Sequence, residues 1–363
     1  MSTPSHDDLV APPAPPRQIL VIRGGAIGDF ILTLPVLAAL RRRYPDARLA
    51  VLGRPHSADL ALAGGLADDV RSIEDRRLTG FFLRDGDLHA EFASFLARFD
   101  LIVSYLYDPE GVFRENLARC SRARFIAGPH RPNESLALHA TEVYLGPLET
   151  LGIVAADPVP RLRLGAHDTF HPSEPGASRP AIALHPGSGS ERKNWPERKW
   201  GGLLDGLVNR TALGVLLVGG EAEGSGLARL ATSRPPWRLQ LAQNLPLVDL
   251  ARRLSECVAF VGHDSGISHL AAAVGLPGVI LWGDSVEAVW RPRNDRCILL
   301  RDPRGLTEIS VSRVLEALNP LVERSGLRDP LAAAHDVMSQ AEPGSPAPQR
   351  WLHPSTCRSL PSP

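Results

Sequence analysis

The interior of the chain repeats one pattern, in which a short apolar run is followed by a stretch of helical hydrophobic periodicity. The first run is QILVIRG, and the segment after it, DFILTLPVLAALRRRYP, has helical spacing until Pro45 ends it. Pro35 lies within the first two turns of this helix and predicts a kink. Strands that alternate with helices form parallel sheets through right-handed crossovers. The pattern therefore predicts an α/β fold.

The alternation stops once, in a segment with three prolines and no periodicity, GAHDTFHPSEPGASRP. Such a segment is typical of a linker, and 363 residues suit two domains. Both ends of the chain are rich in proline and poor in apolar residues, which favours disorder. We expect two Rossmann-like, doubly wound domains facing a central cleft. The predicted parts are a disordered tail (1–16), an N-terminal domain (17–164), the linker (165–180), a C-terminal domain (181–320) and a largely disordered tail (321–363).

Composition excludes several classes of protein. Forty basic and forty acidic residues give no net charge, so there is no overall field that would attract nucleic acid. The four cysteines are scattered without zinc-ligand spacing, as in reduced cytosolic proteins. No apolar run reaches the length of a membrane span, and the acidic, proline-rich N-terminus does not look like a signal peptide. We expect a cytoplasmic protein.

Ligands of open α/β sheets bind beyond the carboxyl ends of the strands, and four predicted strand ends carry polar or glycine-rich sequence. After the first strand, Gly24, Gly25 and Gly28 would let the backbone approach a ligand closely. Asp29 then begins a helix. It is either a first-turn acid favoured by the helix dipole or a general base at the cleft. The glycine spacing does not match G-x-G-x-x-G, so it is a poor dinucleotide fingerprint.

Two strand ends of the second half offer further candidates. The segment LHPGSGSERKNWPE combines glycines, hydroxyl groups such as Ser188 and one lysine, Lys193. This combination suits a diphosphate, although a solvated loop would have a similar composition. After the strand LGVLLVGG comes Glu221 or Glu223. Either acid could complement a helix dipole or accept hydrogen bonds from ribose hydroxyls.

The fourth strand end is GHDSGISHL. The helix that begins there offers free amide groups and a partial positive charge, which suit an anion. Ser265 and Gly266 could donate to phosphate, while Asp264 is expected to cap the helix and orient the loop. His269 lies one turn into the helix. It is either a structural histidine or a group that faces the ligand.

Three segments together resemble glycosyltransferase family 9, the heptosyltransferase family. They are ILVIRGGAIGDFILTLPVLAALRRRYP, LHPGSGSERKNWPERKW and GHDSGISHLAAAVGLPGVILWGDS, and they occur in the family's order within residues 17–320. The resemblance implies the GT-B fold, with the nucleotide sugar held mainly by the C-terminal domain. One departure is Asp284 in GDS, where family members often read GPT, which adds a negative charge near the donor.

The resemblance also implies roles for the candidate residues. Asp29 matches the proposed catalytic base, and Lys193 matches the lysine that contacts donor phosphate, with Ser188 in the loop before it. Glu223 is the better match to the ribose-binding acid, with Glu221 as the alternative. The D-[ST]-G-x-x-H signature around the diphosphate is matched by Asp264, Ser265, Gly266 and His269.

The implied reaction is an inverting transfer of a sugar, by family default heptose from ADP-heptose, onto a lipopolysaccharide-core-type or other glycan acceptor. We expect no cofactor and no metal, because the nearest D-x-D sequence, DGD at 85–87, lies in a variable segment. The acceptor is expected on the N-terminal domain. The segment 75–89, which contains Arg76, Arg77, Phe81, Phe82 and Arg84, is the candidate to contact a lipid-linked, anionic acceptor at the inner face of the membrane, and this would be a peripheral membrane contact. We expect both phenylalanines to be exposed, although a mobile loop with packed aromatics is the alternative.

Three other functions share parts of this pattern. A GT-B epimerase would act on a nucleotide sugar without transferring it. An NAD-dependent Rossmann oxidoreductase would need G-x-G-x-x-G and an acid about 20 residues later, which the sequence lacks. A non-catalytic family member would bind a nucleotide sugar or a partner without catalysing a reaction, and the retention of Asp29, Lys193 and His269 argues against it.

Overall fold

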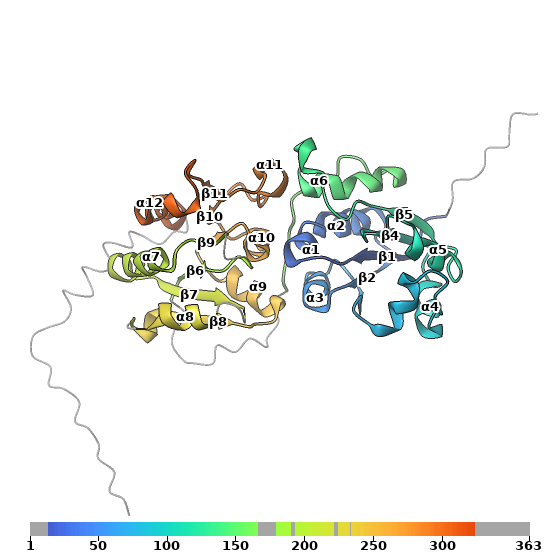
Figure 1. Ribbon diagram of the computed structural model, residues 1–363, viewed down its shortest axis with the longest axis horizontal. Coiled ribbons are helices and arrows are strands. Elements are labelled where there is room, and N and C mark those ends of the chain that lie inside the picture. The colour runs from blue at the N-terminus through green and yellow to red at the C-terminus, as the bar shows by residue number, and fades with distance from the viewer. Residues whose placement is uncertain (1–13, 166–178, 190–192, 221–223, 233, 324–363) are drawn as a thin grey trace, which may run out of the picture.

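The computed structural model describes residues 14–165, 179–189, 193–220, 224–232 and 234–323. These residues form two lobes that lie side by side, with the N-terminal lobe in blue and green and the C-terminal lobe in yellow to red (Figure 1). Most of both predicted disordered tails and most of the predicted linker fall outside the described residues, so the predicted domain boundaries remain a prediction.

The N-terminal lobe has, in the described residues, a five-stranded parallel sheet in the order β3-β2-β1-β4-β5. The strands are β1 (Gln18–Arg23), β2 (Arg48–Gly53), β3 (Asp69–Ser72), β4 (Leu101–Ser104) and β5 (Arg124–Ala127). Its helices are α1 (Ile27–Ile31), α2 (Leu34–Arg43), α3 (Pro55–Ala63), α4 (Ala90–Leu96), α5 (Val112–Ala118) and α6 (Ala140–Leu145), with short 3-10 helices η1 (Arg76–Phe82), η2 (Glu134–Leu136) and η3 (Gly146–Leu151).

The C-terminal lobe has, within the described ranges, a six-stranded parallel sheet in the order β11-β10-β9-β6-β7-β8. The strands are β6 (Ala181–His185), β7 (Gly214–Gly219), β8 (Leu239–Gln243), β9 (Ala259–His263), β10 (Gly278–Leu281) and β11 (Cys297–Leu300). Its helices are α7 (Glu197–Arg210), α8 (Gly224–Ala231), α9 (Leu247–Ser255), α10 (Gly266–Ala273), α11 (Glu287–Trp290) and α12 (Val311–Glu323), with 3-10 helices η6 (Pro236–Arg238) and η7 (Leu306–Glu308). The predicted α/β fold with two Rossmann-like lobes is confirmed.

The predicted kink at Pro35 is a full break between α1 and α2. Pro35 is the second residue of α2, and the two helices are separated by Leu32 and Thr33. A proline has no backbone N–H, so it cannot donate to the carbonyl one turn earlier. At the break, the Thr33 N–H donates to the Phe30 carbonyl at 2.9 Å, and Thr33 Oγ1 donates to the Asp29 carbonyl at 2.8 Å. The break leaves α1 as a short separate helix whose start faces the other lobe (Figure 1).

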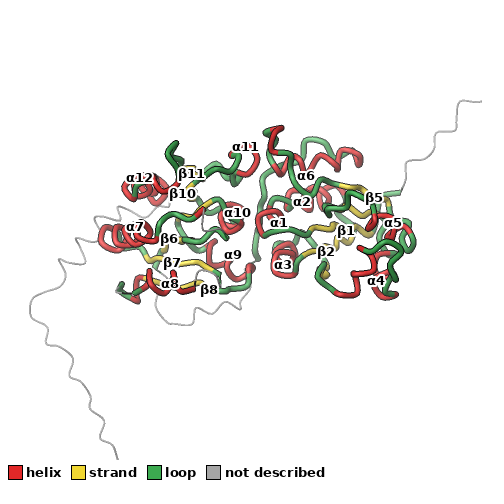
Figure 2. The backbone as a smooth tube through the Cα atoms, viewed as in Figure 1, coloured by secondary structure: helices red, strands yellow, loops and turns green. Residues whose placement is uncertain are grey.

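Alternate residues of the central strands pack into different apolar layers, because successive side chains of a strand point to opposite faces. In β1, Ile19 and Val21 join a cluster that also contains Leu250 and Leu270 of the other lobe. Leu20 of the same strand belongs to the outer layer of the N-terminal lobe, and a third cluster lies under α7 and α12. Helices therefore cover both faces of each sheet (Figure 2). The middle layer is shared by the two lobes.

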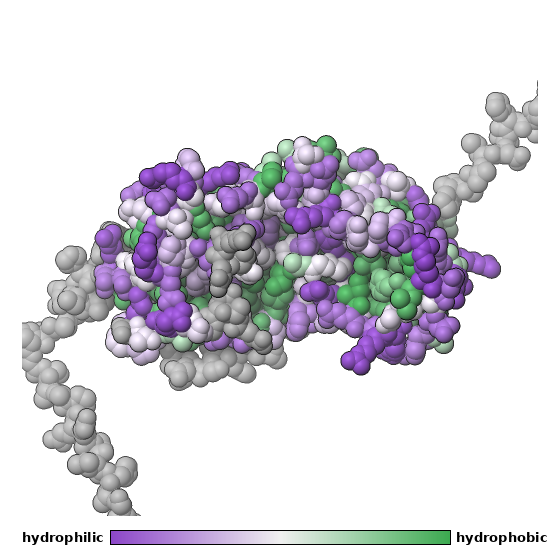
Figure 3. All heavy atoms as spheres, in the orientation of Figure 1, coloured by the Kyte–Doolittle hydropathy of each residue, from purple (hydrophilic) through white to green (hydrophobic). Residues whose placement is uncertain are grey.

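The lobes touch most closely where α1 meets α10. A Cβ atom added to Gly266 would lie 2.8 Å from Ile27 Cβ and 2.9 Å from the Gly28 nitrogen, so only glycine fits there. Farther along the boundary, His139 Nε2 lies 2.9 Å from the Arg291 carbonyl oxygen, and Arg293 pairs with Glu142. Apolar residues reach the surface along part of this boundary on the face seen in Figure 3. None of the helices in the described part of the chain is both long and apolar enough to cross a bilayer.

Candidate active site

A cleft of about 1100 Å³ lies between the lobes and is lined by residues of both. Its lining follows the carboxyl ends of β1, β4, β5, β6, β9, β10 and β11, the edge at which open α/β sheets bind ligands. Nearly all the predicted site residues line it: Gly24, Gly25, Gly28, Asp29, Ser188, Lys193, Asp264, Ser265, Gly266 and His269. Glu223 and its alternative Glu221 lie outside the described residues. The cleft thus brings the candidate base and the candidate phosphate-binding residues together.

Asp29 occupies the third position of α1, and its side chain is 28% exposed. Its Oδ2 accepts a hydrogen bond from the Ala26 N–H at 3.0 Å, which makes it one half of a capping box. The left-handed backbone at Gly25, with φ of 94°, makes room for this contact, because a Cβ atom there would lie 2.8 Å from Asp29 Oδ2. The first-turn role of Asp29 and a position at the cleft are therefore compatible.

Arg23, the last residue of β1, supports Asp29 from below, and sequence reasoning missed it. Its side chain is only 2% exposed, and its Nη2 lies 3.4 Å from Asp29 Oδ1. Its Nη1 donates to the His130 carbonyl at 2.9 Å, and its guanidinium lies 4.5 Å from the centre of the Tyr144 ring. Among the described residues, Nη2 has no hydrogen-bond partner beyond this ion pair. The sequence signal that could have identified Arg23 is its position as a charged residue at the end of the apolar strand β1.

Lys193 and Asp264 form an ion pair at the C-terminal side of the cleft. Lys193 Nζ lies 2.9 Å from Asp264 Oδ2 and 3.1 Å from Ser285 Oγ, and Ser285 also donates to Asp264. The expectation that Asp264 caps the following helix is wrong. The N-cap residue of α10 is Ser265, and its side chain makes no capping hydrogen bond. The Asp264 carboxylate does not cap the helix because it is engaged by Lys193 and Ser285. Ser285 belongs to the GDS departure, and Asp284 also lines the cleft.

Two other predicted residues have identified contacts. Ser188 Oγ donates to Asn194 Oδ1 at 2.7 Å, which links the two sides of the loop after β6. His269 is 6% exposed and lies on α10 opposite the start of α1, since a Cβ atom on Gly28 would be 3.4 Å from His269 Cδ2. Burial lowers the pKa of His269 to about 4, although Asp264 and Asp29 act in the opposite direction. The imidazole is therefore neutral near pH 7.

The proposed membrane segment departs from expectation. Phe81 is fully buried, whereas Phe82 is exposed as expected, with its ring 5.3 Å from that of Phe113. Arg77 pairs with Asp75 and Glu91, and Arg84 pairs with Glu110. The expectation that Phe81 is exposed was wrong, because η1 packs its side chain into the outer apolar layer of the N-terminal lobe. None of residues 75–89 lines the cleft.

The N-terminal wall of the cleft is formed by residues that sequence reasoning did not single out. Tyr107 is 72% exposed, and its ring centre lies 4.5 Å from that of His130. Glu134 accepts hydrogen bonds from Arg131 and from Trp290 Nε1, each at 3.0 Å, so it joins the two lobes across the cleft. The described residues contain no group of three His, Cys, Asp or Glu side chains arranged to hold a metal ion.

Comparison with known proteins gives a consistent result. A profile of "Glycosyltransferase family 9 (heptosyltransferase)" matches residues 138–312. Lipopolysaccharide heptosyltransferase 2 of Salmonella typhimurium is 25% identical, with 85% of this chain and 100% of the relative aligned. The enzyme of the same name from Escherichia coli K12 is 26% identical, with 84% and 98% aligned.

Solved structures of low sequence identity share the fold. A family 9 glycosyltransferase from Veillonella parvula superposes with a TM-score of 0.70 at 18% identity, covering 85% of this chain and 98% of that one. ADP-heptose lipopolysaccharide heptosyltransferase II of E. coli also gives 0.70, at 20% identity, covering 85% and 99%. The two-lobed arrangement described above is thus the GT-B fold.

Proposed function

Since this chain belongs to glycosyltransferase family 9 and is a glycosyltransferase, we propose that it transfers heptose from ADP-heptose to a lipopolysaccharide-core-type acceptor with inversion. The observation that carries this proposal is the shared cleft, in which Asp29 of one lobe faces Lys193 and His269 of the other. The names of the aligned relatives support the donor and the acceptor class.

The proposed reaction is a single displacement at the anomeric carbon. Asp29 removes the proton from the acceptor hydroxyl while that oxygen attacks, and the bond to the nucleoside diphosphate breaks. A positioned base of this kind contributes about 10²–10⁴-fold in rate. The two contacts of the Asp29 carboxylate, with the Ala26 N–H and with Arg23, fix its orientation before the acceptor binds. Oxygen lone pairs remain for the substrate proton.

The leaving diphosphate gains negative charge as the bond breaks, so groups that bind it should bind the transition state more strongly. Lys193, the hydroxyl of Ser188 and the beginning of α10 at Ser265 and Gly266 are the proposed stabilisers. His269 is uncharged and can act only as a hydrogen-bonding group at neutral pH. We propose that these residues do without a metal ion and that Glu223 or Glu221 binds the ribose.

The acceptor is proposed to enter along the N-terminal wall, where Tyr107, His130 and Arg131 line the cleft. The Arg131 guanidinium suits the anionic substituents of such an acceptor, and the exposed Tyr107 ring offers an apolar face against which a sugar can pack. We propose that the enzyme works on the cytoplasmic side and meets the membrane only peripherally, through its acceptor.

The test is a panel of ligands followed by a product assay. Thermal-shift measurements should rank ADP and ADP-heptose above UDP, GDP and NAD. A preference for NAD would favour an oxidoreductase. ADP release should require both ADP-heptose and a heptose-deficient acceptor glycan, and mass spectrometry should find the acceptor enlarged by one heptose. An altered nucleotide sugar with no change in the acceptor would favour the epimerase alternative and contradict the transferase.

A further inference from the structure

His263 is the last residue of β9, and it lies beneath the cleft without lining it. Its side chain is fully buried, yet both ring nitrogens have partners. Nε2 accepts a hydrogen bond from the Trp195 N–H at 2.8 Å, and Nδ1 lies 3.2 Å from the Gly187 carbonyl oxygen. A backbone N–H can only donate and a carbonyl can only accept. The ring must therefore be the neutral form with its proton on Nδ1.

These two partners stand on opposite sides of the candidate phosphate-binding residues. Gly187 immediately precedes Ser188, and Trp195 follows Lys193 by two residues. One imidazole thus joins the incoming and outgoing sides of the loop that follows β6. The Ser188–Asn194 hydrogen bond adds a second link next to it. Ser188 and Lys193, the two candidate phosphate ligands, lie in the sequence between the two backbone groups that His263 contacts.

The ring is held in place by aromatic packing. The Trp200 ring centre lies 5.4 Å from that of His263 at an interplanar angle of 81°, and Trp195 and Trp200 pack edge to face at 5.3 Å. Burial lowers the pKa of His263 to about 4, so the neutral form persists well below neutral pH. The imidazole of His263 therefore keeps its position and its two hydrogen bonds at neutral pH.

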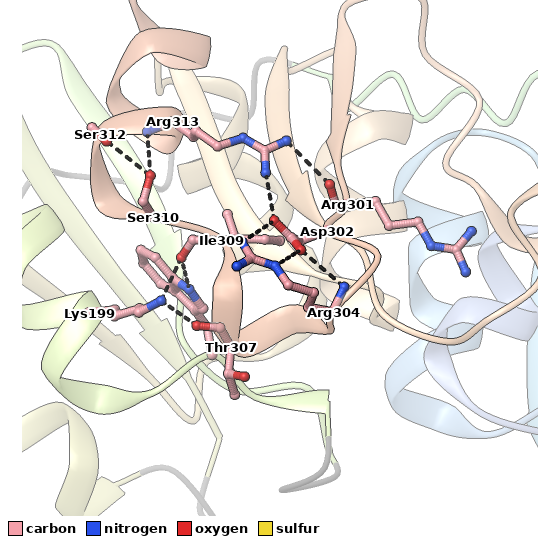
Figure 4. A network of polar contacts seen from close by, with 10 residues as sticks. Lys199, Arg301, Asp302, Arg304, Thr307, Ile309, Ser310, Ser312 and Arg313 are labelled. Carbon is pink, nitrogen blue, oxygen red and sulfur yellow. Dashed lines mark hydrogen bonds and ion pairs between the residues drawn. The ribbon is translucent and has the colours of Figure 1, made fainter.

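Trp195 links this loop to a second loop of the cleft, which contains Thr307 and Ile309. Its Nε1 donates to the Ile309 carbonyl at 3.0 Å, and Lys199 Nζ donates to the same oxygen at 2.8 Å. Figure 4 shows Lys199 reaching the carbonyl oxygens of both Thr307 and Ile309. Thr307 lines the cleft. Displacement of Trp195 would thus disturb two walls of the donor side.

We propose that His263 is a positioning residue for donor binding, which holds Ser188 and Lys193 at the distance that a diphosphate requires. The proposal rests on the function proposed above. It assigns to a buried histidine outside the cleft a contribution to donor affinity, through the two backbone groups that it joins.

His185 provides a matched control. It closes the neighbouring strand β6, is 6% exposed, and its Nδ1 has no hydrogen-bond partner within the described ranges. His263→Leu and His185→Leu remove the same group from adjacent strand ends, but only the first releases the loop. His263→Gln keeps one donor and one acceptor and serves as the conservative variant.

Two measurements on the full chain test the proposal. Titration calorimetry with ADP should give a Kd about tenfold higher or more for His263→Leu, an intermediate value for His263→Gln and a nearly unchanged value for His185→Leu. Steady-state kinetics should show a higher KM for the nucleotide sugar together with a lower kcat, because Ser188 and Lys193 are proposed to bind the leaving diphosphate more strongly in the transition state. Hydrogen exchange at the Trp195 amide should be faster in His263→Leu than in His185→Leu, with or without ADP.

The outcomes separate the two proposals. If the wild type binds ADP and His263→Leu binds it equally well, the positioning role is overturned. Unchanged exchange at Trp195 would overturn it without any ligand, even if the wild type binds no nucleotide and the proposed function fails. Should His263→Leu not fold, His263→Gln against His185→Gln decides the same question by the same two measurements.

Discussion

Lys193 Nζ lies 2.9 Å from Asp264 Oδ2, so the lysine expected to meet the donor is already paired with a carboxylate. Lys193 is 46% exposed and Asp264 is 13% exposed, and Ser285 bonds to both. The pair orients the ammonium group towards the cleft before any ligand arrives. A diphosphate must therefore share Lys193 with Asp264 or displace it from that acid.

Lys193→Met tests the phosphate contact. A hydrogen bond to a charged group is worth about 1.5–3 kcal/mol, so the Kd for ADP should rise by about 10–100-fold. Arg198→Met, which removes an exposed charge from α7, is the control and should change the Kd little. Calorimetry with ADP measures both. Equal affinity in wild type and Lys193→Met would remove Lys193 from the phosphate site.

Asp29→Asn tests the base. Asparagine keeps an oxygen that can accept from the Ala26 N–H, so α1 should stay in place while the basic group is lost. We expect kcat to fall by about 10²–10⁴-fold with the Kd for ADP nearly unchanged. Asp46→Asn, at an exposed position, should behave as wild type. A large loss of ADP affinity in Asp29→Asn would count against its assignment as the base.

Arg23→Met tests the support beneath Asp29. The change removes the ion pair to Asp29 and the hydrogen bond to the His130 carbonyl. We expect the free energy of unfolding to fall by about 1–3 kcal/mol and kcat to fall, with donor affinity retained. Urea unfolding and steady-state rates provide the measurements. Arg54→Met, which breaks an exposed pair with Glu74, is the control. A Kd that changes while kcat does not would contradict this role.

Gly266→Ala tests the contact between the lobes. The added methyl group would lie 2.8 Å from Ile27 Cβ, so α1 and α10 must separate. Overpacking of this kind costs about 1–3 kcal/mol, and we expect a lower Tm together with reduced transfer. Gly146→Ala, where the Cβ atom would meet nothing within 4 Å, should be neutral. A Gly266→Ala variant with the Tm of the wild type would contradict this prediction, because it would show that α1 and α10 can accommodate the added methyl group without loss of stability.

Stability should fall between pH 6.5 and 4. Burial lowers the pKa of His263 and of His269 to about 4, and that of His185 to about 3, from an ordinary 6.5. In this range the unfolded chain binds protons that the folded chain does not, so the free energy of unfolding decreases as the pH falls. Urea unfolding at pH 7, 6 and 5 measures the slope. His185→Leu should reduce it, and a flat profile would contradict the burial of these groups.

The apolar pattern of the sequence predicted the central strands and the edge strand β5, and it missed the other three edge strands. Central strands such as β1 and β9 are almost wholly apolar, because both of their faces are buried. The three strands that escaped prediction, β3, β8 and β11, all lie at sheet edges, where β8 is largely exposed and carries a weaker pattern. The local spacing that favoured a continuous helix also gave no sign that Pro35 would separate α1 from α2 completely.

The site shows the same division between local and distant information. Asp29, Lys193 and His269 were predictable because each follows a strand end in a recognisable segment. Arg23 and His263 were not, since their importance comes from partners far along the chain, such as the His130 carbonyl and the Trp195 amide. The engagement of Asp264 by Lys193, 71 residues away, likewise overrode the capping that its local position favoured.

The apolar layer that contains Val21, Leu250 and Leu270 belongs to neither lobe alone. Separating the lobes would expose the apolar side chains of this layer to water. Each lobe therefore depends on contact with the other for part of its thermodynamic stability. We therefore expect substrate exchange to require only a small rotation of one lobe against the other, rather than a wide separation. On heating, the two lobes should unfold together in one cooperative transition rather than as two independent domains.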